Sequence, residues 1–232
     1  MNSRAALPLS QGVLGWVAYL AAGSFLGTAW SAAAVGAWAV GTSVASTYVF
    51  FRNATEVDDR VLRAKPYREE MLTWLESGRG PEARPLETLA RHTRELIWYV
   101  AAAVMTANLG ALVMGAILLN YMNAYVATIV RAATRPLRAA ALAWNVWSVV
   151  RVAAYIALGA AGGSLVLRFL SFRVDAAAMR GLAIAGAAGA VLDLTLKLAL
   201  SRPLGRALAS SIDLAAAREN RFVQPTLALH LE

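Results

Sequence analysis

Long apolar runs alternate along the chain with shorter polar segments. The longest run extends from Leu96 to Tyr121 and contains no charged side chain over 26 residues. A helix rises about 1.5 Å per residue, so about 20 such residues cross a hydrocarbon core about 30 Å thick. Trp98 and Tyr99 lie near one end and Tyr121 at the other, as expected of aromatic rings that settle at the two head-group levels. The pattern predicts a membrane-spanning helix over residues 96–121.

Four further apolar runs predict spans over residues 12–31, 34–51, 147–170 and 181–200. Only a few small, uncharged residues separate the first two runs, and so short a connection predicts a tight antiparallel hairpin. The expected fold class is an all-α membrane protein. Its architecture would be a polytopic bundle of five, possibly six, transmembrane helices with a small cytoplasmic helical hairpin.

The sixth helix arises if residues 96–138 cross the membrane twice. Five spans place 13 Lys and Arg residues on the cytoplasmic side against 8 outside, whereas six spans place 17 there against three or four. The preference of Lys and Arg for the cytoplasmic side favours six spans. Length favours five, because the 36 residues from Leu96 to Arg131 are too few for two full spans and a turn. Half-length segments that meet at residues 108–110 or 120–123 would reconcile the two models.

Residues 52–95 differ abruptly in composition, with nine Lys and Arg and nine Asp and Glu. They predict a charged cytoplasmic helical hairpin whose second helix begins near Pro85. In the first helix Tyr67, Met71 and Leu75 recur every four residues and form one apolar face. The segment is too small for a core of its own, so we expect it to pack against the spans or a partner.

The remaining domain boundaries follow the same pattern. Residues 1–51 form an N-terminal transmembrane hairpin, and residues 96–200 hold the transmembrane bundle. Within the bundle, residues 122–146 are basic and are predicted to lie at the membrane interface. Residues 201–232 predict a basic amphipathic tail on the membrane surface.

Composition narrows the functional classes. The chain is 59% hydrophobic and 16% charged, which is typical of membrane proteins. It has no cysteine and two histidines, so neither a thiolate site nor a haem or zinc site is expected, and no cofactor is predicted. The net charge of +8 is explained by arginines that flank spans, so we expect a lipid bilayer and no nucleic acid as partner. The sequence contains no catalytic motif, and we expect no enzymatic activity.

Three charged residues fall within predicted spans. Asp193 and Lys197 are four residues apart, share a helix face and can form an ion pair. Such a pair is either structural, with the lysine reaching towards the interface, or part of an ion pathway. Arg151 lies one turn inside an interface, where it reaches the head groups, lines a vestibule or pairs with Asp193.

These features predict a multi-pass protein of a bacterial-type inner membrane, with residues 52–95 in the cytoplasm. The leading functional hypothesis is a channel or transporter component that acts as a homo-oligomer, because symmetry would multiply Asp193, Lys197 and Arg151 into polar rings. The alternative is a non-catalytic assembly or scaffold subunit of a larger membrane complex. The scarcity of polar residues within the spans favours this alternative.

Overall fold

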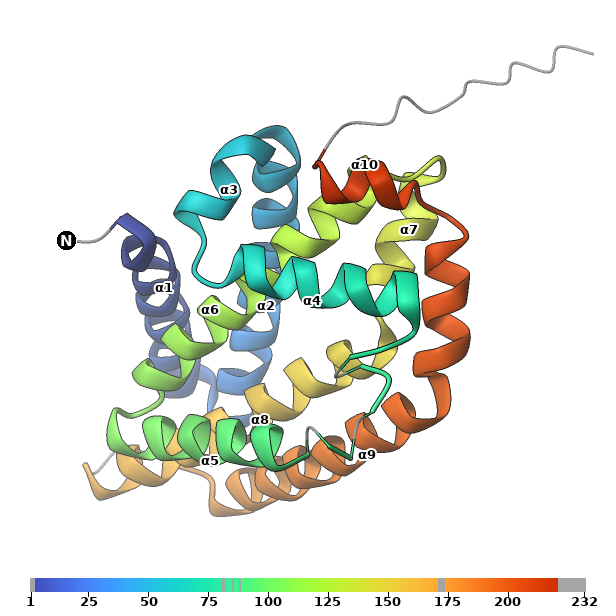
Figure 1. Cartoon of the computed structure of the whole chain (residues 1–232). Helices are drawn as coiled ribbons and strands as arrows, with labels where there is room; N and C mark the ends of the chain where they lie inside the picture. Colours follow the sequence, from blue (N-terminus) through green and yellow to red (C-terminus); the bar gives the residue numbers. More distant parts are fainter. Residues whose placement is uncertain (1–2, 81, 85, 88, 171–173, 221–232) are drawn as a thin grey trace, which may run out of the picture.

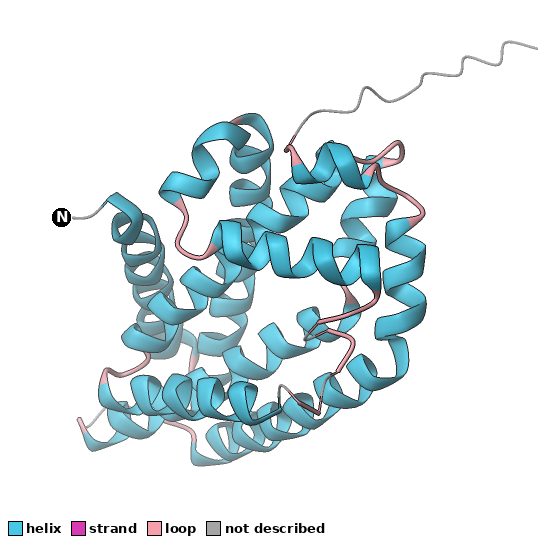
Figure 2. Ribbon diagram, in the orientation of Figure 1, coloured by secondary structure: helices cyan, strands magenta, loops and turns pink. Residues whose placement is uncertain are grey.

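The computed structural model describes residues 3–80, 82–84, 86–87, 89–170 and 174–220, and every regular element within them is a helix (Figures 1 and 2). Within the described residues, five helices are long and apolar enough to span a membrane: α1 (Ser3–Leu26), α2 (Thr28–Arg52), α6 (Leu109–Arg131), α8 (Val146–Phe169) and α9 (Ala176–Ala209). The shorter helices are α3 (Ala54–Arg60), α4 (Ala64–Ser77), α5 (Leu89–Met105), α7 (Pro136–Ala143) and α10 (Leu214–Arg218). The all-α fold with five apolar helices agrees with the sequence pattern.

Helices α1 and α2 form an antiparallel hairpin that turns on one glycine. Gly27 has φ 98°, a left-handed conformation that glycine adopts without the strain of a Cβ atom. Both helices differ from the predicted spans, because α1 ends at Leu26 and α2 begins at Thr28.

The predicted single helix over residues 96–121 is wrong. Helix α5 ends at Met105 and α6 begins at Leu109, with Ala107 at φ 48° and Asn108 at φ 78° between them. The indole Nε1 of Trp16 in α1 donates a hydrogen bond to the carbonyl oxygen of Ala107 at 2.9 Å. A side chain of a neighbouring helix thus provides a hydrogen bond to a backbone carbonyl group at the break. Irregular backbone is tolerated in an apolar environment only where other protein groups satisfy it in this way. The break coincides with residues 108–110, one of the two places where half-length segments were expected to meet.

The boundaries that follow the break also differ from the prediction. Residues 122–131 belong to α6 and most of them are buried, so only the remainder of the expected interfacial segment 122–146 forms separate structure. Helix α9 runs through Pro203 to Ala209, and the first part of the expected tail 201–232 therefore continues the last apolar helix. Residues 221–232 of that tail lie outside the described residues.

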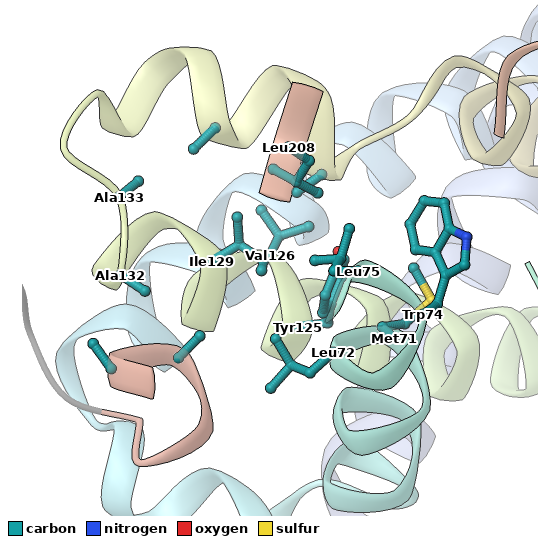
Figure 3. Close-up of a cluster of buried hydrophobic side chains, with 14 of the residues drawn as sticks. Met71, Leu72, Trp74, Leu75, Tyr125, Val126, Ile129, Ala132, Ala133 and Leu208 are labelled. Atoms are coloured by element: carbon teal, nitrogen blue, oxygen red, sulfur yellow. The ribbon is translucent and has the colours of Figure 1, made fainter. Parts of the chain in front are cut away.

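Helix α4 lies at the centre of the largest buried apolar cluster (Figure 3). Met71, Leu72, Trp74 and Leu75 pack there against side chains from α6, α7, α8, α9 and α10. The charged segment 52–95 is consequently folded over the apolar helices as part of the same core. Pro85, near which the second helix of that segment was expected to begin, lies outside the described residues, and α5 begins at Leu89.

Helices α8 and α9 approach closely through small residues. A Cβ atom added at Gly186 would lie 2.5 Å from Cγ of Leu158 and 3.0 Å from the carbonyl oxygen of Ala154. By contrast, a Cβ atom at Gly181 on the same helix would meet no atom within 4 Å. Close backbone approach through such residues is a main source of helix association in lipid.

We therefore expect Gly186→Ala to lower stability by about 1–3 kcal/mol, the usual cost of overpacking. Gly181→Ala is the matched control and should be neutral or stabilising by up to about 1 kcal/mol, since alanine favours helix. Thermal unfolding in detergent, followed by tryptophan fluorescence, measures both. Equal midpoints for the two variants would contradict the close packing of α8 on α9.

Candidate functional site

Helices α2, α4, α5, α6 and α8 enclose a cavity of about 110 Å³, here called the charged cavity. Its ionisable lining comprises Arg63, Arg91, Arg151, Glu70, Glu82, Glu95, His92, Tyr67, Tyr99, Tyr121 and Tyr155. All but Arg151 and three of the tyrosines come from residues 52–95. The segment predicted as a charged hairpin thus supplies most of the ionisable groups that line this cavity.

The predicted ion pair between Asp193 and Lys197 does not form, because each residue has a different partner. Asp193 accepts two hydrogen bonds from Arg151, from Nε at 2.8 Å and from Nη2 at 3.1 Å. The planar guanidinium matches the two carboxylate oxygens better than a single ammonium does. The close approach of α8 to α9 brings the guanidinium within reach, so of the alternatives for Arg151 the pairing with Asp193 is the one observed.

Lys197 instead reaches the loop between α4 and α5. Its Nζ donates to Oε1 of Glu82 at 2.9 Å, and the lysine and glutamate side chains are only 2% and 10% exposed. The two residues are 115 positions apart in the sequence. This buried ion pair fastens the loop to α9 and closes one wall of the charged cavity.

The other charges of the cavity are paired more loosely. Arg91 lies 3.6 Å from Glu70, and Nδ1 of His92 lies 3.5 Å from Oε2 of Glu95. Arg63 is exposed and its guanidinium lies 5.9 Å from the centre of the Tyr121 ring. Among the carboxylates of the described residues, none lies within ion-pair distance of Arg63.

Several buried polar atoms on residues that line the cavity have no hydrogen-bond partner among the described residues. They are Oε2 of Glu82, Nε of Arg91 and both ring nitrogens of His92. A buried polar atom without a partner costs about 1–3 kcal/mol, so native structures retain few of them. The cavity therefore offers a polar ligand an acceptor on Glu82, a donor on Arg91 and the ring nitrogens of His92.

A second hollow of about 240 Å³ lies between α5, α8 and α9. His92, Arg151 and Tyr155 line both this second hollow and the charged cavity. The Arg151 side chain, held by Asp193, therefore forms part of a partition between the two spaces.

The environment of the cavity changes the pKa of two groups in the charged segment. The approach of the His92 imidazole lowers the pKa of Glu95 below its ordinary 4.5 against the opposing effect of burial, and the charges of Arg91 and Arg63 lower it further. Burial raises the pKa of Tyr67 well above 10, and the charge of Glu82 adds to the rise. Glu95 is thus held as a carboxylate and Tyr67 as a neutral phenol.

Sequence reasoning found Arg151, Asp193 and Lys197 but missed the residues that α5 contributes. Arg91, Glu95 and Tyr99 are spaced by four residues and so lie on one face of that helix. This polar stripe, which leads directly into the apolar run, was the signal that could have placed α5 beside a polar space.

Within the residues that the structure describes, no group of three or more His, Cys, Asp or Glu side chains is arranged to hold a metal ion. Comparison with known protein families, characterised proteins and solved structures finds no match. The geometry of the cavity and its surroundings is therefore the basis for a functional proposal.

Replacing Lys197 tests the buried ion pair. Lys197→Met leaves the Glu82 carboxylate buried without a cation and should lower the free energy of unfolding by about 3–5 kcal/mol. Adding Glu82→Gln should restore part of that loss because it removes the uncompensated charge. The exposed pair of Arg84 and Glu87 is the control, and Arg84→Gln should cost no more than about 1 kcal/mol. A loss for Lys197→Met as small as that control would contradict a structural role for the pair.

The lowered pKa of Glu95 makes a prediction about acid stability. A carboxyl whose pKa is lower in the folded state stabilises that state above the unfolded pKa, here about 4.5, and loses its contribution as pH falls through the folded pKa. Glu95→Gln should therefore reduce the difference between the unfolding midpoints at pH 7 and pH 3. Identical pH profiles for the variant and the natural sequence would show that Glu95 makes no such contribution.

Proposed function

We propose that the protein is a membrane transporter whose solute-binding site is the charged cavity. The support comes first from the unpartnered polar atoms on Glu82, Arg91 and His92, which a bound polar solute would satisfy. Ionisable groups inside a membrane bundle are costly and typically mark binding sites or pathways. Transport rather than simple binding is favoured by the geometry around Arg151.

The observation that carries the proposal is the partition shared by the charged cavity and the second hollow. It consists of the side chains of His92, Arg151 and Tyr155, and two hydrogen bonds to Asp193 hold the guanidinium in place. A change of side-chain conformation at this point would join the two spaces without breaking a helix. A solute in the charged cavity would then have a second exit.

The pathway is proposed to lie within each subunit. The sequence suggested that an oligomer was needed to gather enough polar lining, which made the scaffold alternative attractive. The polar groups of residues 52–95 line a space inside the single chain, and this removes the main argument for that alternative. Oligomerisation remains compatible with the proposal but does not build the site.

We further propose that the basic end of the bundle faces the cytoplasm. Arg131 at the end of α6 donates to the carbonyl oxygen of Phe51 at the end of α2, and Asn220 donates to that of Ala54 in α3, so these segments share one end. Gly27 and residues 106–108 form uncharged turns at the other. Because the chain breaks after α5, the helix order matches the model with six crossings. In that model 17 Lys and Arg residues lie on the cytoplasmic side and three or four on the other side.

Cysteine accessibility tests the transport proposal directly, because the sequence contains no cysteine. Met122→Cys places a thiol in the charged cavity, and Ala116→Cys places one at a fully buried position of the same helix as a control. A membrane-impermeant thiol reagent is added to right-side-out and to inverted membrane vesicles. A transporter site that opens to both sides should be modified at Met122→Cys in both preparations, and Ala116→Cys in neither.

The partition predicts a further difference. Replacing the ion pair by the neutral combination Arg151→Gln with Asp193→Asn should increase the slower of the two modification rates at Met122→Cys about tenfold, which corresponds to about 1.4 kcal/mol. Modification from one side only, in both the parent and this variant, would overturn transport and leave a one-sided binding pocket. Absence of modification from either side would support the scaffold alternative.

A further inference from the structure

A third and larger space lies beside the charged cavity and is almost entirely apolar. This apolar groove has a volume of about 830 Å³ and runs between α2 on one side and α7 and α8 on the other, with α6 beneath. On α2 its lining follows one helix face from Gly36 through Val40 and Val44 to Phe51. Those 16 residues span about 24 Å at a rise of about 1.5 Å per residue. The groove is therefore longer than one half of a hydrocarbon core about 30 Å thick.

The groove is open at its side. Val40 and Val44 are 66% and 67% exposed, and Leu137 on α7 is 89% exposed. Helix α2 is one of the helices able to span a membrane, so these exposed apolar side chains would contact lipid. A hydrocarbon chain could thus enter the groove from the bilayer without crossing water.

The groove adjoins the charged cavity. Ala39, Leu119, Val152 and Ile156 line both spaces, so polar and apolar chambers share one wall. Movement of these side chains would join the two chambers, and a molecule with a polar head and an apolar tail would then fill both. A small water-soluble solute would leave the groove without a role.

The charges of the cavity indicate the chemistry of the head group. Its lining carries three arginines and three glutamates, which suits a head group with both charges better than one with a single charge. The buried Oε2 of Glu82 is an acceptor with a negative charge, and a primary ammonium supplies both a donor and the opposite charge. Arg63 is suited to a phosphate, because among the described residues no carboxylate lies within ion-pair distance of its guanidinium.

We propose that the solute is a zwitterionic membrane amphiphile, with an ammonium-phosphate head group in the charged cavity and a hydrocarbon chain in the apolar groove. This inference rests on the proposed function and names its substrate class. Membrane lipid is the source of the ligand, which reaches the cavity sideways through the opening beside α2.

Two glycines of α2 provide a matched pair of variants for the groove. A Cβ atom at Gly36, in the groove, or at Gly41, outside it, would meet no atom within 4 Å. Gly36→Leu therefore fills the groove without a clash in the protein, whereas Gly41→Leu adds the same side chain elsewhere on the helix. For the head group, Arg63→Gln removes the free cation, and Lys65→Gln removes an exposed cation two residues away.

The measurement is lipid retention by the full-length, detergent-solubilised protein in native mass spectrometry. The probes are phosphatidylethanolamine, phosphatidylcholine and phosphatidylglycerol with identical acyl chains. We expect one phosphatidylethanolamine per chain, retained at least about tenfold more than either competitor. Gly36→Leu should reduce this retention about tenfold or more, since displacing two methylene groups from an apolar site already has that effect. Arg63→Gln should reduce it to a similar extent because it removes the cation proposed to bind the phosphate. Gly41→Leu and Lys65→Gln should leave it unchanged.

The outcomes separate this inference from the transport proposal. Equal retention of the three lipids, or equal effects of Gly36→Leu and Gly41→Leu, overturns the amphiphile, even if thiol labelling shows access from both sides. Preferential retention of phosphatidylglycerol overturns the zwitterionic head group. Selective retention of phosphatidylethanolamine with one-sided thiol labelling supports the binding site and rejects transport.

Discussion

The buried ion pair between Lys197 and Glu82 is the interaction on which the rest of the site depends. It joins the loop after α4 to the middle of α9 and so holds the charged segment 52–95 against the apolar helices. Transfer of either charge alone into an apolar interior would be strongly unfavourable, but a well-aligned pair offsets much of that cost. The charged cavity exists because this segment is folded inward, and the pair is what allows it to remain there.

A second pairing follows the same principle about one helical turn away on α9. Arg151 and Asp193 neutralise each other between α8 and α9, and the small residues of those helices let them come close enough for two hydrogen bonds. Packing and electrostatics are therefore coupled, because each makes the other possible. Each span carries few polar residues, but the bundle gathers a dense set of them where its segments converge.

The fold class could be predicted from the sequence because apolar length alone identifies helices able to span a membrane. The interruption at Asn108 was harder, since no charge or proline marks it and a hydrogen bond from Trp16 in a distant helix stabilises it. Lys197 and Asp193 were recognised as important, but their helical spacing suggested each other as partners. Their actual partners come from tertiary packing, with Glu82 separated by 115 residues, and no local pattern encodes that contact.

The cationic and the anionic anchor of the site, Lys197 and Asp193, both lie on α9, which is synthesised after the other long helices that the structure describes. Until then, Glu82 and Arg151 lack the counter-charges that they have in the folded protein. The two ion pairs can therefore form only once α9 is present. A truncated or stalled product would display unsatisfied charges beside apolar helices, and such a surface is what membrane proteases and chaperones can recognise during quality control.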